Sequence, residues 1–279
     1  MDCKIWKSNI REWIKVTGED SEDYLQSQFS QDLRPLKEGD STYGLFLGLK
    51  GKVRADGFVV KFGKESYGII SYFCDANELI SIIEENVIAD DVEFEKIPVK
   101  ESFVIQSSNP IEIFPDAIVF PGRWMKEEHY DVLPQNGDAS NDDSHSFGEL
   151  ESLRIQNGII AVPKDIGPNE LPQEGGLEEV AVSFNKGCFL GQEVMARLKA
   201  MGKVQRRIYQ VSGNGKLPEP GSAVLCEEKT AGELKSVTQC SNDDSWIGLA
   251  LLRWKIVEEH KASAWSVAEN SHITILEIA

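Results

Sequence analysis

The sequence is poor in cysteine, in basic residues and in long apolar runs. Its five cysteines are widely spaced among 279 residues, whereas a disulfide framework uses an even set in a short secreted chain. No Cys-x-x-Cys pair occurs and the four histidines are scattered, so we expect no metal site. Phosphate-loop, dinucleotide and Gly-x-Ser-x-Gly motifs are missing as well, which leaves kinase, dehydrogenase and hydrolase functions without support.

Charge and hydropathy exclude further classes. The chain has 29 Lys and Arg against 46 Asp and Glu, a formal net charge of −17. A nucleic-acid binder meets the phosphate backbone with a basic surface, so we expect no direct nucleic-acid contact. No apolar run approaches the ~18 residues of a membrane-spanning helix, and the first residues resemble neither a secretion signal nor a transit peptide. We expect a cytoplasmic protein without a membrane segment and, by default, a monomer.

Periodicity predicts an α+β arrangement for the first half of the chain. Asp20 or Ser21 can cap a short helix that ends near Ser27, and Asp75 with Glu78 has capping-box spacing before a second helix. These helices are expected to cover one face of a mostly antiparallel sheet. The predicted strands are 10–18, 42–49, 52–62, 66–73, 92–97, 102–106 and 117–120.

The second half begins with a polar stretch. Residues 134–146 contain no apolar residue larger than Ala and are interpreted as a loop or linker. A second apolar periodicity covers 147–155, and short strands separated by turns follow, which predicts a small closed β-domain. Those strands are 208–211, 223–226, 233–238, 247–251 and 272–278.

The densest chemical signal lies at Phe184–Arg197, an extended segment that runs into a helix near Gly191. Lys186 and Cys188 stand two apart, so an extended backbone would place both side chains on one face. The ammonium and the helix N-terminus would then favour a Cys188 thiolate. Glu193 could pair with Lys186.

A second interpretation of Cys188 is a buried small hydrophobic residue, the commoner role of a lone cysteine. Gly187 lets another group approach the backbone closely. A basic run follows and favours a functional role, although the charges alone indicate either a solvated face or a cradle for an anionic ligand. Its members are Arg197, Lys199, Lys203, Arg206, Arg207 and Lys216.

Phe184–Arg197 closely resembles the Lys-Gly-Cys-Tyr-x-Gly-Gln-Glu signature of the YgfZ family. These are folate-binding proteins of iron–sulfur cluster assembly and repair, related to the glycine-cleavage aminomethyltransferase. Weaker similarities keep the family order: 16–32 with Ser27 where Gly is usual, 153–159 like the middle strand, 171–177, and 231–236 and 247–253 in the barrel. The signature residues here are Lys186, Gly187, Cys188, Phe189 in place of Tyr, Gly191, Gln192 and Glu193.

The resemblance implies an α+β, aminomethyltransferase-like (GcvT-like) fold of several subdomains with mixed or antiparallel sheets, plus a small C-terminal β-barrel. Residues 1–133 would form a folate-binding-type subdomain, 147–203 the second part of the folate-binding region, and 204–279 the barrel. The ligand would be tetrahydrofolate or a one-carbon-substituted folate. Cys188 would be the functional thiol and Lys186 its catalytic partner.

Folate contacts follow from the ligand's chemistry. The pterin edge could pair with Gln173 or Glu174, and a solvated turn is an equal alternative for both residues. The glutamate carboxylates could be bound by Arg197, Arg206 or Arg207 as bidentate forks. Arg11 and Leu150 stand where some family members place tryptophans, and Trp13 could substitute in stacking.

Three functions remain open at this point. The first is an accessory factor for iron–sulfur apo-enzymes or cluster-assembly proteins, with an indirect effect on tRNA processing. The second is a folate-dependent, aminomethyltransferase-like one-carbon transfer enzyme, since a fold does not fix a function. The third is a scaffold whose basic groove holds an acidic segment of a partner.

Overall fold

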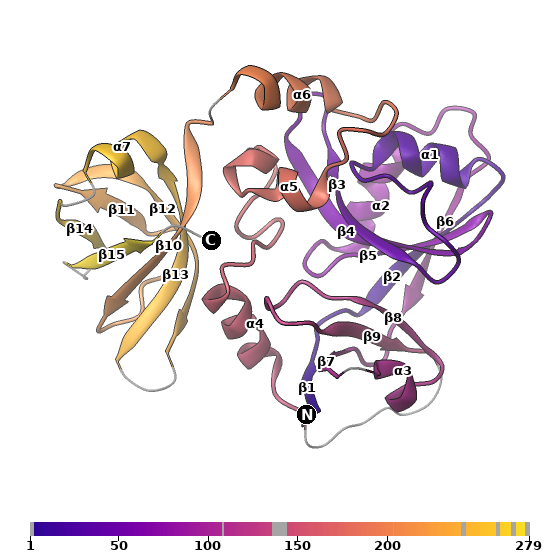
Figure 1. Cartoon of the computed structure of the whole chain (residues 1–279), viewed down its shortest axis with the longest axis horizontal. Helices are drawn as coiled ribbons and strands as arrows, with labels where there is room; N and C mark the ends of the chain where they lie inside the picture. The colour runs from indigo at the N-terminus through magenta and orange to yellow at the C-terminus, as the bar shows by residue number, and fades with distance from the viewer. Residues whose placement is uncertain are drawn as a thin grey trace.

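The computed structural model describes residues 3–107, 109–135, 144–202, 204–240, 244–260, 263–268 and 272–276. It contains three antiparallel sheets (Figure 1), the first with the strand order β3-β4-β5-β2-β6. Its strands are β2 (Glu12–Thr17), β3 (Ser41–Leu47), β4 (Val53–Gly63), β5 (Ser66–Ile70) and β6 (Glu93–Pro98). The five predicted strands of this region are confirmed, although consecutive residues of β3, β4 and β5 are buried and their side chains do not alternate between buried and exposed.

Two helices cover one face of this sheet, α1 (Ser21–Gln28) and α2 (Ala76–Glu84). Asp75 caps α2, since its carboxylate accepts hydrogen bonds from the backbone N–H of Asn77 (2.9 Å) and Glu78 (3.3 Å). Asp20 stands at the predicted N-cap position of α1, but the predicted side-chain hydrogen bond is wrong. The Asp20 carboxylate accepts instead from Asp91 N at 2.8 Å, and the Ser21 hydroxyl is buried without a hydrogen-bond partner among the described residues.

The second sheet has the order β1-β7-β9-β8. Strands at β7 (Phe103–Gln106) and β8 (Ala117–Pro121) are confirmed, whereas β1 (Lys4–Lys7), β9 (Tyr130–Pro134) and the short helix α3 (Pro110–Ile113) were not predicted. In β9 the fully buried Asp131 interrupts the apolar pattern.

Helix α4 (Phe147–Gln156) lies where a strand was predicted at residues 153–159. Residues 153–159, interpreted as a strand, form the end of α4 and its C-terminal turn. A capping box starts the helix, because the Ser146 hydroxyl accepts from Glu149 N (3.2 Å) and the Glu149 carboxylate accepts from Ser146 N (2.8 Å). Residues 136–143 of the predicted linker lie outside the described residues.

The third sheet is a nearly closed barrel with the order β14-β11-β12-β13-β10-β15, its outer strands β14 and β15 in contact. Four predicted strands are confirmed, and the fifth is confirmed within β15, since 277–278 are not described. Its elements are β10 (Arg206–Asn214), β11 (Ala223–Cys226), β12 (Lys229–Gln239), β13 (Ser245–Arg253), α7 (Trp254–Glu259), β14 (Trp265–Val267) and β15 (Ile273–Leu276).

The barrel is joined to the rest of the molecule by α4, which contacts β1, β12 and β13. Arg154 of α4 is 1% exposed and forms the centre of this joint. Its guanidinium donates to the carboxylates of Asp165 (2.6 Å) and Glu151 (2.9 Å) and to the hydroxyl of Ser236 on β12 (3.0 Å). Every N–H group of a buried guanidinium needs such a partner.

Between the N-terminal sheets and the barrel lie the remaining helices (Figure 1): η1 (Pro172–Glu174), α5 (Leu177–Ala181) and α6 (Gln192–Met201). Within the described ranges, no helix combines the length and the apolar character needed to cross a membrane. The segment between α5 and α6 carries most of the signature.

Candidate functional site

The signature segment, Phe184–Arg197, packs beside the C-terminal end of α1. Backbone hydrogen bonds run from Leu190 N to Ser27 O (2.9 Å) and from Ser183 N to Ser30 O (3.0 Å). Two stretches more than 150 residues apart in sequence are therefore held in register.

Lys186 points into this contact. Its ammonium donates to the backbone carbonyl oxygens of Gln26 (2.7 Å), Phe29 (2.6 Å) and Gln31 (2.9 Å). The residue is buried, and burial lowers the pKa of its ammonium to about 8. The predicted pairing of Lys186 with Glu193 is wrong, since Glu193 instead binds Arg197 on the exposed face of α6 at 3.0 Å.

Cys188 is an exposed free thiol. The backbone bends through residues 184–187 rather than running extended, so Lys186 turns inward and Cys188 outward. The expectation of a shared face is therefore wrong, and so is the interpretation of Cys188 as a buried hydrophobic residue. Around Gly187 a Cβ would meet nothing within 4 Å, which leaves its backbone open to an approaching group.

Helix α6 begins after Gly191, as predicted. Gly191 has a φ of +82°, and a Cβ there would lie 2.8 Å from the carbonyl oxygen of Gly48 in the β3–β4 hairpin. The neighbouring Gln192 donates its backbone N–H to Phe189 O at 3.1 Å, and the Phe189 ring is buried in the core. Glycine is required where the helix start meets the hairpin.

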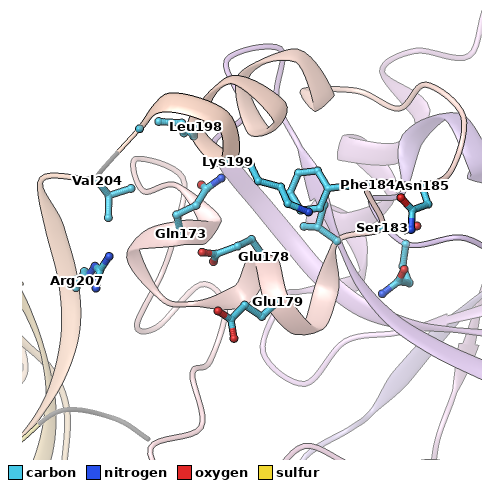
Figure 2. Close-up of a pocket in the computed structure, with 13 residues that line it drawn as sticks. Gln173, Glu178, Glu179, Ser183, Phe184, Asn185, Leu198, Lys199, Val204 and Arg207 are labelled. Carbon is cyan, nitrogen blue, oxygen red and sulfur yellow. The ribbon is translucent and has the colours of Figure 1, made fainter.

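A cavity of about 730 Å³ lies between α5, the signature segment, α6 and the start of β10 (Figure 2). Phe184 contributes an aromatic face, over which the Lys199 ammonium lies at 3.8 Å from the ring centroid. Glu178 and Glu179 of α5 line the opposite side, and Arg207 lines the end near the barrel. Burial raises the pKa of Glu178.

A second cavity, of about 420 Å³, adjoins the first. The two share Gln173, Glu178, Glu179 and Arg207 in their linings, and the smaller one adds Arg123. The shared wall is therefore formed by η1, α5 and β10. Both cavities lie where the N-terminal sheets face the barrel.

Gln173 is the predicted pterin contact that the structure places at this shared wall. Its Nε2 donates to Met195 Sδ at 3.3 Å, and its Oε1 is buried without a partner in the described part of the chain. Glu174 lines the smaller cavity, and its carboxylate is buried in a pair with Arg206, at 2.8 Å from Nε, so the interpretation as a solvated turn is wrong for this residue. This bidentate pair occupies the Arg206 fork that was expected to bind a ligand.

The other residues predicted to contact folate or an anionic ligand do not lie together in the structure. Arg207 faces both cavities, but Arg197 lies on the outer face of α6 with Glu193, and Lys203 is outside the described residues. Trp13 is buried in β2 against Phe62, with ring centroids 5.4 Å apart. It is absent from the described linings of both cavities.

The structure adds a buried carboxyl group that the sequence patterns did not predict. Asp56 of β4 accepts hydrogen bonds from the Tyr43 hydroxyl (2.7 Å) and the Ser71 hydroxyl (3.2 Å). Burial raises its pKa to about 6. Arg123, which lines the smaller cavity, places its guanidinium 3.9 Å from the centroid of the Tyr43 ring. In the sequence, a single acidic residue inside the apolar run 55–60 was the feature that could have indicated this group.

Comparison with known proteins is consistent with this architecture. Residues 5–105 match the model of the GCVT N-terminal domain, and residues 205–274 match that of the CAF17 C-terminal beta-barrel domain. The glycine cleavage system aminomethyltransferase T of Bartonella henselae has the same fold, with a TM-score of 0.79, 14% identity, and coverage of 99% of this chain and 85% of that one.

Two sequence relatives are informative. The tRNA-modifying protein YgfZ of Hamiltonella defensa is 26% identical over 277 residues, which cover 85% of this chain and 80% of the relative. The mitochondrial iron–sulfur cluster assembly factor IBA57 of Mus musculus is 33% identical over 123 residues, covering 40% of this chain and 33% of the relative.

Proposed function

We propose that this chain, which joins a GCVT N-terminal domain to a CAF17-type C-terminal β-barrel, is a folate-binding accessory protein for the assembly or repair of iron–sulfur clusters. The observation that carries the proposal is an exposed thiol, Cys188, on the segment whose Phe184 and Asn185 line the larger cavity. A ligand in that cavity would lie against the same segment as the thiol. The names of the YgfZ and IBA57 relatives support the assignment.

The partners would be iron–sulfur apo-enzymes or cluster-assembly proteins. A tRNA-modifying iron–sulfur enzyme among them would connect this chain to tRNA processing without direct RNA contact, in keeping with its net charge of −17. We place this activity in the cytoplasm as part of the proposal.

The cavity residues suit a reduced folate. A volume of about 730 Å³ is within the usual range of roughly 300–1,000 Å³ for ligand sites. The buried Oε1 of Gln173, which has no hydrogen-bond partner among the residues that the structure describes, is an acceptor for the N–H edge of a pterin after a small side-chain rotation. Arg207 offers a fork for a glutamate carboxylate. Tetrahydrofolate, or a one-carbon-substituted form, would supply a one-carbon carrier there.

Removal of Cys188 tests the function. Cys188→Ala should fold normally, because the side chain is exposed, but it should fail to restore the activity of a dependent iron–sulfur enzyme in cells that lack the native factor. Cys3→Ala is the matched control, since Cys3 is also an exposed free thiol, and it should restore activity fully. Full rescue by Cys188→Ala would remove this thiol from the mechanism.

Loss of Arg207 tests the folate site. Arg207→Ala should weaken tetrahydrofolate binding about tenfold, the usual effect of losing one charged hydrogen-bonding group. Isothermal titration calorimetry would measure the change. Arg197→Ala removes an arginine that lies outside the described cavity linings and should bind like the wild type. Equal affinity of all three proteins would contradict the proposed site.

An aminomethyltransferase-like enzyme is the second candidate. It is favoured by Asp56, whose buried carboxylate accepts from the Tyr43 hydroxyl beside Arg123 of the smaller cavity. Burial raises the pKa of this group to about 6, and a general acid or base works best with a pKa near the working pH. An assay for methylenetetrahydrofolate formation separates the candidates. Turnover would favour the enzyme, and folate binding without turnover would favour the accessory protein.

A further inference from the structure

Helix α1 ends at Phe29, whose backbone N–H donates to Leu25 O at 2.8 Å. The last carbonyl oxygens of a helix lack intrahelical partners, and basic side chains near the C-terminus are favourable. No basic residue lies in the last turn of α1. The carbonyl oxygens of Gln26 and Ser27 are bound instead by the Lys186 ammonium and by Leu190 N, both from the signature segment.

We propose that Lys186 is a positioning residue that caps α1 from the signature segment and thereby fixes the loop that carries Cys188. The three N–H bonds of an ammonium match the three carbonyl oxygens that surround it, those of Gln26, Phe29 and Gln31. The planar fork of an arginine does not match three acceptors that converge on one point.

The anchor also joins the thiol loop to the larger cavity. Gln31, whose carbonyl oxygen binds Lys186, lines that cavity together with Phe184 and Asn185, which immediately precede Lys186. Lys186 therefore links two walls of the cavity. Two other charged groups influence it, Asp32 and Arg34, but they pair with each other at 2.8 Å. The carbonyl oxygens remain its direct partners.

This inference rests on the proposed function only in the role that it gives to Cys188. Its test needs neither folate nor an iron–sulfur partner. Hydrogen exchange of the Leu190 amide should be more than about tenfold faster in Lys186→Met, since at least one charged hydrogen bond to the α1 terminus is lost. The Leu79 amide, which donates to Asp75 O at 2.8 Å in α2, should exchange as in the wild type. Lys186→Arg should behave like Lys186→Met.

Alkylation of Cys188 by iodoacetamide separates an anchor from an electrostatic partner. In Lys186→Met the pH midpoint of the alkylation rate should stay at its wild-type value, with Cys3 as internal reference. A raised midpoint with unchanged Leu190 exchange would overturn the inference, because it would show that the Lys186 ammonium stabilises the Cys188 thiolate. Wild-type exchange in Lys186→Arg would also overturn it.

A measurement on the wild-type protein tests the buried position of the Lys186 ammonium even if the variants do not fold. Acetic anhydride should acetylate Lys186 far more slowly than Lys199, because Lys186 is buried with all three N–H bonds occupied, whereas Lys199 is exposed. Equal rates would overturn the inference. Failure of Cys188→Ala to lose function would contradict the proposed function and leave these results untouched.

Discussion

Replacing Arg154 with Ala is expected to lower the free energy of unfolding by about 3–5 kcal/mol, the usual cost of removing one partner from a buried ion pair. Asp165, the partner at 2.6 Å, is fully buried and would be left in a low-dielectric site without the guanidinium. Ser236 of the barrel would lose a hydrogen bond at the same time. The barrel should therefore lose much of its connection to α4.

Urea unfolding measures this effect, with Arg197→Ala as the matched control. Arg197 forms an exposed pair with Glu193 on α6, and exposed pairs contribute only about 0–1 kcal/mol. A similar small loss in both variants would show that the Arg154 network does not stabilise the joint. Limited proteolysis between α4 and the barrel would show whether the two parts separate.

Asp131 is expected to make the protein less stable as the pH rises from about 4 to about 7. Its carboxyl group is fully buried, and burial raises its pKa to about 7, although the carboxylate accepts hydrogen bonds from Tyr72 (2.6 Å) and Trp124 (3.1 Å). Unfolding returns the pKa to about 3.9. Between these values the folded state binds the proton and the unfolded state does not, so stability falls by roughly 4 kcal/mol over the interval.

The variant Asp131→Asn isolates this contribution. The difference in unfolding free energy between wild type and variant should shift by roughly 4 kcal/mol from pH 4 to pH 7, in favour of the variant at the higher pH. Asp56, whose pKa is also raised, is present in both proteins and cancels. A difference that does not depend on pH would contradict the buried, protonated carboxyl group.

The sequence predicted those elements that depend on interactions between residues close together in the chain. Capping of α2 by Asp75 depends on residues two and three positions away. The hairpin of β3 and β4 pairs neighbours in sequence. The helix start at Gly191 and the barrel strands follow from turn residues and alternation in the same way. The short strand β1 escaped prediction because its partner β7 lies about a hundred residues later, as in the pair Lys4 and Gln106.

The signature segment illustrates the same limit at the site. Its residues were identified from the sequence, and the exposed position of Cys188 agrees with a role outside the core. Lys186 was assigned to the wrong partner, because two-residue spacing describes an extended strand and the segment bends. Glu174 and Arg206 were both expected to face a ligand, yet they pair with each other across 32 residues.

The amino-acid sequence by itself determined the kinds of elements, the capping of α2 and the position of the signature, since these depend on periodicity and on nearby hydrogen-bonding groups. The tertiary structure decided which charges are used internally and which remain available. Lys186 finds its acceptors at the end of α1 and in the residues that follow it, about 160 residues earlier, and Arg154 finds Ser236 on the barrel. A charged side chain taken out of water must bind whatever the fold brings within reach, and only the folded chain establishes what that is.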